Sequence, residues 1–298
     1  PGPMYCRAAK WSAILLLALP VLPSLARRLL TGRAAQRQGA LPKPGGWLRP
    51  LLFALPLLEG ESIIRLTSPL ESRGYVDMTL QVLRDRGIRV EELPEGFRVP
   101  GGQQYGRGTL GEEADYSQAA FWLAAAGLGS PLTVEGLDPD STQGDRCAVP
   151  YFQQLAGPGR VELDIAQCPD LAPALAVRAA LRPGQTARLV NAGRLRLKEC
   201  DRLAAIPEEL NKLGGQLTEG ADFLEIRGVE RLLGGVADSH NDHRIAMMLA
   251  VAATRAEGTV TIRGAESVAK SYPDFWEVYE SLGGRVLRQR EEREACDM

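Results

Sequence analysis

The chain has 298 residues, of which 45% are hydrophobic and 24% charged, a balance typical of a globular protein long enough to bury two cores or one large one. Its 35 Lys and Arg residues nearly cancel its 37 Asp and Glu residues, and only 6% of residues are aromatic, so neither a basic field nor stacking platforms favour nucleic-acid binding. The five cysteines form no Cys-x-x-Cys pair, which argues against a disulfide framework or a structural zinc site and indicates a reducing compartment, the cytoplasm.

Residues 1–45 form an irregular, low-complexity segment rich in Ala, Arg, Leu and Pro. An apolar run over 13–22 follows two basic residues and precedes a Ser-Leu-Ala stretch, which imitates a secretory signal peptide. The run is too short to span a bilayer. A secretory leader and a transit peptide stay open as alternatives, but we favour a truncated or altered N-terminal region. No later segment indicates a membrane.

The rest of the chain repeats one α/β unit four times. Each unit has a helix of small apolar residues, a strand, a second helix that ends in Gly, and a short strand. The small-residue helices are expected at 47–58, 116–126, 171–181 and 243–253, and the strands after them at 62–66, 131–134, 186–190 and 259–262. The second helices are expected to close near 83–87, 155–157, 210–214 and 282–283, with short strands at 88–90, 160–163, 216–218 and 285–287. Such repetition indicates similar α/β units packed together.

Local signals mark the ends of these helices. Asp115, Asp170 and Asp242 each stand at or next to the start of a small-residue helix, where a carboxylate satisfies free amide groups. The Gly after each second helix is expected to adopt the left-handed backbone conformation. Because the Ala-rich stretch 119–126 permits close approach of neighbours, we expect helices inside and sheets outside. We place a domain boundary near residue 113, after a Gly-rich polar loop.

Charged residues from three separated segments suit a small anionic ligand. Lys198, Glu199 and Arg202 lie within five residues of one another, Arg244 follows in an Asn-Asp-His-Arg stretch, and Lys270 comes later. Several cations that converge on one point suit a ligand with phosphate and carboxylate groups, and a carboxylate among them suits proton transfer. These residue types predict an enzyme that acts on phosphorylated and carboxylated substrates.

The same stretches resemble the signature sequences of EPSP synthase, the 3-phosphoshikimate 1-carboxyvinyltransferase family. The similar stretches are 115–117, 143–145, 168–171, 196–203, 241–247 and 269–275, within a resemblance that runs over about 47–285. The resemblance implies repeated βαβαββ units that form an inside-out α/β barrel, with helices inside and sheets outside. It also implies a transferase of the shikimate pathway of aromatic amino-acid biosynthesis. The family moves the enolpyruvyl group of phosphoenolpyruvate to the 5-hydroxyl of shikimate 3-phosphate, by addition and elimination, as a monomer without metal or cofactor.

The resemblance also implies how the chain is divided. The family has six repeats, three in each of two domains, whereas four are counted here. On this basis 46–113 is the last repeat of a partial first domain, 114–287 is a complete three-repeat second domain, and 288–298 is a solvated tail. The family's Lys-Ser-x-Ser-x-Arg stretch is not intact, and its nearest echo, at 10–17, lacks the arginine. We therefore expect the isolated chain to bind its substrates weakly and to turn over little or nothing.

Two carboxylates match the family's acid–base groups. Asp170 matches the carboxylate beside the shikimate hydroxyls and is the candidate base, and Glu199 matches the carboxylate that serves the methylene proton. Ser72 and Lys198, with Asp170, match contacts to shikimate 3-phosphate.

Three cations match the family's phosphoenolpyruvate contacts. Arg202 and Arg244 match a guanidinium pair for the carboxylate, where a planar fork binds better than a lysine. Lys270 matches the cation at the transferred phosphate, where it stabilises the leaving anion.

Simpler interpretations of these residues stay open. Lys198, Glu199 and Arg202 have the spacing of an exposed, salt-bridged helix face, and Asp170 can be read as a helix cap alone. Tyr75, near Ser72, is interpreted as a packing residue.

The two histidines and Cys200 are given structural interpretations. His240 and His243 are three residues apart and imitate a metal pair, but no third ligand pattern accompanies them, so we expect no metal and assign His243 to bracing its loop. Cys200 is interpreted as a small polar spacer and not as a nucleophile, because no basic partner is assigned to it.

Two alternative functions stay open beside carboxyvinyl transfer to shikimate 3-phosphate. The related transferase that acts on UDP-N-acetylglucosamine shares the fold, but its cysteine-bearing loop has no candidate here. A non-catalytic remnant or ligand-binding module of the same fold is the other alternative, which the altered N-terminal region favours.

Overall fold

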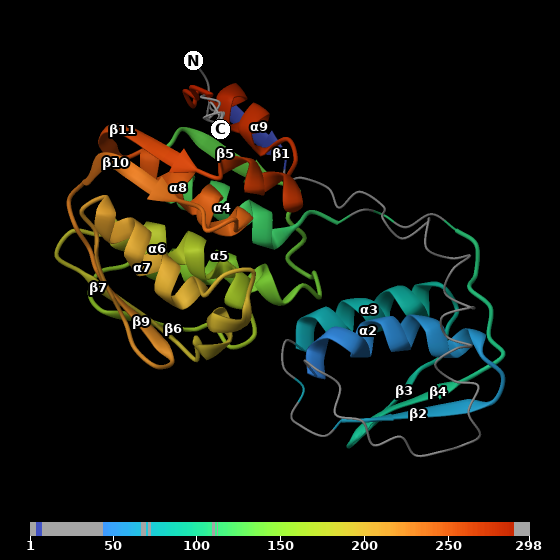
Figure 1. Ribbon diagram of the computed structural model, residues 1–298. Helices are drawn as coiled ribbons and strands as arrows, with labels where there is room; N and C mark the ends of the chain where they lie inside the picture. Colours follow the sequence, from blue (N-terminus) through green and yellow to red (C-terminus); the bar gives the residue numbers. More distant parts are fainter. Residues whose placement is uncertain are drawn as a thin grey trace, which may run out of the picture.

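The computed structural model describes residues 4–7, 44–66, 70, 73–108, 111 and 113–288. Residues 44–100, here called the smaller unit, form a helix pair packed on a three-stranded sheet (Figure 1). Its helices are α2 (Pro44–Ala54), continued by the 3-10 turn η2 (Leu55–Leu57), and α3 (Arg73–Asp85); its antiparallel sheet has the order β2 (Glu61–Arg65), β4 (Gly96–Pro100), β3 (Glu91–Leu93). In α3, Val76, Leu80 and Leu83 recur at helical spacing, so one face is buried in a core shared with Leu52 of α2.

Residues 114–288, here called the larger unit, alternate helices with short strands. The helices are α4 (Tyr116–Gly127), α5 (Ala148–Ala156), α6 (Ala172–Ala180), α7 (Arg202–Lys212), α8 (His243–Ala253) and α9 (Phe275–Ser281), with 3-10 turns η3 (Gly144–Cys147), η4 (Pro169–Leu171), η5 (Gly193–Leu197) and η6 (Ala265–Lys270). The strands are β5 (Leu132–Glu135), β6 (Val161–Asp164), β7 (Thr186–Val190), β8 (Gln216–Glu219), β9 (Phe223–Arg227), β10 (Leu232–Asp238) and β11 (Ala256–Arg263).

Three small sheets cover the helices of the larger unit. The four-stranded sheet has the order β6-β7-β9-β8, in which β6 and β7 are parallel and the other pairs are antiparallel. β10 pairs in parallel with β11, and β5 pairs in parallel with β1 (Met4–Arg7). Alternate residues of β7 and β9, such as Leu189 and Leu224, are fully buried, so each strand turns one face inward.

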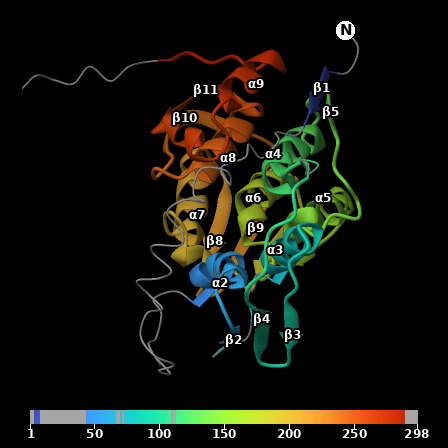
Figure 2. The same cartoon turned by 90° about the vertical axis from the view of Figure 1, so that its right-hand side faces the viewer.

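Helices α4, α6 and α8 lie inside, between the sheets (Figures 1 and 2). Every residue of α8 from His243 to Ala252 is buried, and α6 is buried at all but one position. Their many Ala residues let the three helices contact one another closely. The predicted arrangement, with helices inside and sheets outside, is confirmed. None of the helices in the described ranges is both long and apolar enough to cross a membrane.

Two expected strands are wrong. Residues 88–90 form an extended connection before β3, and 285–287 have no strand partner among the described residues. The predicted repeat also left out β4, β9 and β10. Gly87, Gly214 and Gly283 adopt φ values of 75°, 87° and 91° as predicted, but Gly157 has φ −73° because the chain leaves α5 in an extended conformation.

Two of the three predicted aspartate caps are confirmed. Asp115 accepts hydrogen bonds from the backbone of Ser117 and Gln118 at the start of α4, and Asp242 accepts one from Arg244 at the start of α8. Asp170 does not cap α6: it lies in η4, and its carboxylate turns to cationic side chains.

The two units meet where α3 begins. Gly74 lies against the backbone of Gly144, at the start of η3, so closely that a Cβ on Gly74 would be 2.7 Å from the Gly144 nitrogen. The backbone nitrogen of Arg73 donates to Gln167 Oε1 at 3.0 Å, and Thr142 Oγ1 is 3.0 Å from Gln81 Oε1. We call this contact between α3 and the loops before α5 and α6 the junction.

Candidate active site

The predicted site residues gather at the N-terminal ends of α6, α7 and α8, beside the junction. Asp170 stands just before α6, Arg202 is the first residue of α7, and Arg244 is in the first turn of α8. Helix N-termini carry partial positive charge, so this end of the larger unit favours anions even before side chains are counted.

Asp170 is the centre of this cluster. Its Oδ1 lies 2.8 Å from Lys198 Nζ and 2.8 Å from Arg202 Nη1, and its Oδ2 lies 3.4 Å from Arg244 Nη2. Burial alone would raise the pKa of Asp170, but the charges of the three cations outweigh burial and hold this pKa well below its usual range. Asp170 is therefore ionised at neutral pH.

Arg202 is fully engaged with carboxylates. Its Nε lies 2.7 Å from Asp242 Oδ2, its Nη2 is 3.2 Å from Asp242 Oδ1, and the same Nη2 donates to Glu199 Oε2 at 2.6 Å. The side chain is 1% exposed and that of Asp242 is 0% exposed. Burial alone would raise the pKa of Asp242, but the hydrogen bonds and charge of Arg202, together with the backbone hydrogen bond from Arg244, outweigh burial and lower this pKa. Asp242 therefore fixes the orientation of the Arg202 fork.

Arg244 and Lys270 approach from two further elements. Arg244 is 9% exposed, and the nearby Asp170 and Asp145 carboxylates raise its pKa although burial opposes this. Lys270 Nζ, at the end of η6, donates to the backbone oxygen of Asn241 at 2.5 Å. Asn241 has the left-handed φ of 54°, in the tight turn that leads into α8. The turn thus ties Lys270 to the backbone just before α8.

Comparisons with known proteins show the family of this chain. The model of the EPSP synthase (3-phosphoshikimate 1-carboxyvinyltransferase) family matches residues 40–161 and 156–279. The chain belongs to this family.

Relatives show how much of the family's length is present. The 3-phosphoshikimate 1-carboxyvinyltransferase of Clostridium acetobutylicum is 46% identical over 250 residues, which cover 79% of this chain and 58% of the relative. That of Clostridium kluyveri is 44% identical and covers 79% and 59%. An EPSP synthase structure from Acinetobacter baumannii superposes with a TM-score of 0.70 at 25% identity, covering 80% of this chain and 60% of that one. The chain thus spans about three fifths of the length of the curated relatives it matches.

Most residues that the EPSP synthase resemblance singled out lie together. Lys198, Arg202 and Arg244 contact Asp170, and Glu199 contacts Arg202. Lys270 contacts the backbone oxygen of Asn241, in the turn that leads into α8. Ser72 lies outside the described residues. The alternative interpretation of Lys198 and Glu199 as a helix face is wrong, because α7 begins only at Arg202 and Lys198 has an extended backbone.

Sequence reasoning missed Tyr75, Asp145 and Ser117. The hydroxyl of Tyr75, interpreted as packing, donates to Asp170 Oδ2 at 3.1 Å and lies 3.4 Å from Asp145 Oδ2. Ser117 Oγ donates to the same oxygen of Asp145. Asp145 and Ser117 both lie in stretches that resemble the family, and this is the signal that could have found them. A tyrosine on an otherwise apolar helix face gave no such signal.

The two histidines are held by different partners. His240 Nε2 lies 2.7 Å from Glu209 Oε1, whereas burial and the charge of Arg244 lower the pKa of His243 to about 4. His243 Nδ1 has no hydrogen-bond partner within the described ranges, so this atom does not brace the loop. Glu208, Glu209 and His240 are close enough to share a metal ion, but Lys212 Nζ already lies 3.0 Å and 2.7 Å from the two carboxylates.

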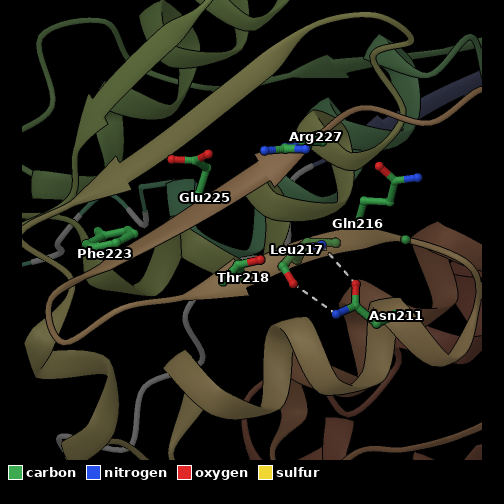
Figure 3. A pocket seen from close by; sticks show the side chains of 8 residues that line it. Asn211, Gln216, Leu217, Thr218, Phe223, Glu225 and Arg227 are labelled. Atoms are coloured by element: carbon green, nitrogen blue, oxygen red, sulfur yellow. Dashed lines mark hydrogen bonds between the residues drawn. The ribbon is translucent and has the colours of Figure 1, made fainter.

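Two further features, the Cys200 thiol and a surface pocket, do not add to the site. Burial, and next the Asp242 carboxylate, raise the pKa of Cys200 to about 12, so its thiol stays protonated. Figure 3 shows a hollow over β8 and β9, lined by residues that include Gln216, Glu225 and Arg227. None of the predicted site residues lines this hollow.

Proposed function

We propose that the chain provides the Asp170 cluster for enolpyruvyl transfer from phosphoenolpyruvate to the 5-hydroxyl of shikimate 3-phosphate, with release of phosphate. Family membership supports the reaction. The observation that carries the proposal is the convergence of Lys198, Arg202 and Arg244, from two separated segments, on one carboxylate. Such a cationic group fits substrates that bring both phosphate and carboxylate groups.

The proposed chemistry assigns each charged group one task. Asp170, ionised at neutral pH, takes the hydroxyl proton while the hydroxyl oxygen forms a bond to C2 of phosphoenolpyruvate. Glu199, whose side chain is 43% exposed, gives a proton to the C3 methylene and later takes one back as the phosphate bond breaks. Lys270 stabilises the departing phosphate.

A substrate that binds these cations must replace ion pairs that the cations already make with carboxylates of the chain. Arg202 and Lys198 are paired with carboxylates, and Arg244 faces Asp170. The carboxylate of phosphoenolpyruvate would draw Arg244 from Asp170 most easily, because that separation is the longest, at 3.4 Å. We therefore assign Arg244 as the first contact of phosphoenolpyruvate.

Calorimetry with each ligand and a phosphate-release assay with both test this proposal. Arg244→Lys removes the planar fork and is expected to weaken phosphoenolpyruvate binding by about 10-fold or more, roughly one charge-assisted hydrogen bond. Arg231→Lys is the matched control, since Arg231 pairs with Glu257 on the surface at 65% side-chain exposure. Absence of binding by the wild type, or equal affinity in both variants, would contradict the proposal.

The same measurements separate the two alternatives. Binding of both ligands with no phosphate released would identify a ligand-binding module. Phosphate release with UDP-N-acetylglucosamine as acceptor would instead identify the related amino-sugar transferase.

We also propose that the protein acts as a monomer in the cytoplasm and does not bind nucleic acid. A formal net charge of −2 gives no long-range attraction to a polyanion. Sedimentation of the purified chain with and without duplex DNA checks the monomeric state and the lack of nucleic-acid binding, and a mass of twice the chain or a shift with DNA would contradict them.

A further inference from the structure

The hydroxyl of Tyr75 lies between two carboxylates that come from different loops. It is 3.1 Å from Oδ2 of Asp170, in η4, and 3.4 Å from Oδ2 of Asp145, in η3. The second separation is long for a hydrogen bond, but it leaves the hydroxyl within reach of both carboxylates. Tyr75 belongs to the smaller unit, so the contact exists only because α3 meets the larger unit at the junction.

Asp145 is buried without full compensation. It is 3% exposed, its Oδ2 accepts from Ser117 Oγ, and its Oδ1 has no hydrogen-bond partner among the described residues. The charged and titratable groups that face it are Arg244 from α8, Asp170 from η4, Asp115 at the start of α4, and Tyr75 from α3. Among these groups Arg244 is the one cation, and the others are acidic.

The two carboxylates consequently hold a proton very differently. Burial raises the pKa of Asp145 to about 6, and Arg244 and Ser117 only partly offset this effect. Asp170 has a pKa far below its usual range because three cations surround it. Burial, and then the two carboxylates, also raise the pKa of Tyr75, so its hydroxyl keeps its proton and is able to pass one on. A proton placed on Asp170 thus gains by moving to Asp145.

On the basis of the proposed function, we propose that Asp145 is the resting place of the proton removed from the substrate hydroxyl, delivered from Asp170 through the hydroxyl of Tyr75. Asp170 takes the proton as the substrate oxygen forms its new bond. The carboxyl group of Asp170 then passes this proton to the Tyr75 oxygen, while the proton of Tyr75 moves to Asp145 Oδ2. Asp170 ends ionised, Tyr75 ends neutral, and Asp145 ends protonated, so charge and protons balance. Asp145 acts through Tyr75 and touches no ligand.

This relay removes a difficulty with Asp170 as the base. A carboxylate surrounded by Lys198, Arg202 and Arg244 is a weak base and returns its proton readily. Moving the proton on leaves Asp170 ionised beside those cations, and it neutralises a carboxylate that is costly to keep charged in a buried site. The relay thus gives a role to the position of the Tyr75 hydroxyl between the two carboxylates.

A carboxyl titration of the full chain without ligands tests the proton affinity of Asp145. Carbon-13 NMR of the aspartate carboxyl groups should show one group that titrates near pH 6 and disappears in Asp145→Asn. Ser117→Ala should raise this midpoint, because the Ser117 hydroxyl stabilises the charged form. Tyr75→Phe should raise it as well, whereas Thr142→Ala, which removes another junction contact, should not. A titration midpoint for Asp145 near about pH 3.9, the usual pKa of an aspartate carboxyl group, would overturn the relay.

The pH profile of phosphate release tests the relay during turnover. Asp145→Asn and Tyr75→Phe should each lower kcat about 10- to 100-fold, the lower range of acid–base effects, with a smaller change in KM. Both should remove the acid limb near pH 6, and the double variant should lose no more than either single one. Thr142→Ala should keep the profile. An unchanged acid limb in Asp145→Asn, or additive losses, would refute the relay.

The two tests also separate this proposal from the proposed function. If the wild type releases no phosphate, the proposed activity of the isolated chain fails. The carboxyl titration then remains as the test of the relay. In that case a midpoint near pH 6 that moves in Tyr75→Phe supports the link between the two carboxylates, and a midpoint indifferent to Tyr75→Phe contradicts it.

Discussion

Asp242 stabilises the fold both as a counter-charge and as a helix cap. Its carboxylate is fully buried, binds two nitrogens of Arg202 and caps α8. Asp242→Asn keeps a side chain able to cap but leaves the buried Arg202 without its main counter-charge. We expect the variant to lose about 3 kcal/mol of unfolding free energy, in line with broken buried ion pairs. Urea denaturation measures this loss.

Asp201→Asn is the control for that experiment. Asp201 caps α7 and pairs with Arg196, but the pair is exposed, at 35% and 41% of the two side chains. An exposed pair contributes less than about 1 kcal/mol. If the two variants lose equal stability, Asp242 does not compensate the charge of Arg202.

Asp145 should give the protein an unusual dependence of stability on pH. Its pKa is about 6 in the folded chain against roughly 3.9 for an unfolded aspartate. Between these values the folded state binds more protons, so unfolding free energy should fall as pH rises from about 4 to 6, by roughly 2 to 3 kcal/mol. Asp145→Asn should remove this fall and be more stable than the wild type at pH 7.

The stability difference between the two proteins, measured by urea denaturation from pH 4 to 8, checks this expectation. Asp140→Asn, at an exposed position nearby, should leave the curve unchanged. Asp170 and Asp242 act in the opposite direction, because their lowered pKa values stabilise the fold above about pH 4 and lose this effect in acid. A difference curve that is flat between pH 4 and 6 would show that Asp145 has an ordinary pKa.

At the scale of elements, the inner helices depend on small side chains. Ala120 in α4 is fully buried where α4 meets α6 and α8. Ala120→Leu has to displace a neighbouring helix and should cost about 1 to 3 kcal/mol. Ala126→Leu, six residues later and only partly buried, should change stability by less than about 0.5 kcal/mol. Thermal unfolding of both variants decides, and equal melting temperatures would mean that the inner layer is loosely packed.

Sequence patterns predicted elements well where the signal is local. The four small-residue helices and the caps Asp115 and Asp242 follow from residues within one turn of each other. β10 was missed because the pair Gly234-Gly235 interrupts its apolar pattern. The predicted strand at 285–287 has apolar residues but no neighbour to pair with in the described part of the chain.

In the site, too, local sequence patterns did not predict contacts between residues that are far apart in the chain. The resemblance singled out Asp170, Arg202 and Arg244, which lie together, but the position of Asp170 before a helix also allowed a helix cap, and only long-range contacts could decide between the two. Tyr75 and Asp145 are 70 residues apart, and nothing in either local pattern says that they meet. Contacts of this kind depend on how the two units pack, which no periodicity records.

At the scale of the whole molecule, the division near residue 113 stays a proposal. Residues 44–100 have a small core of their own, separate from the core of 114–288. Limited proteolysis that cuts first within 101–113 and leaves a fragment beginning near 114 would support the division. A first cut inside the larger unit would contradict it.

The close approach of Gly74 to Gly144 holds the two units together. Gly74→Ala would place its Cβ 2.7 Å and 2.8 Å from the nitrogen and Cα of Gly144, which are backbone atoms and cannot rotate away. Ala favours the helix by about 1 kcal/mol over Gly, so α3 itself should not weaken. The start of α3 should instead move off η3 and separate Tyr75 from Asp170. Hydrogen exchange should therefore rise at 73–77 and 142–147, while the inner helices keep their protection. Gly111→Ala, with no atom within 4 Å of the added Cβ, is the control, and unchanged exchange in Gly74→Ala would mean that the junction tolerates the added methyl group.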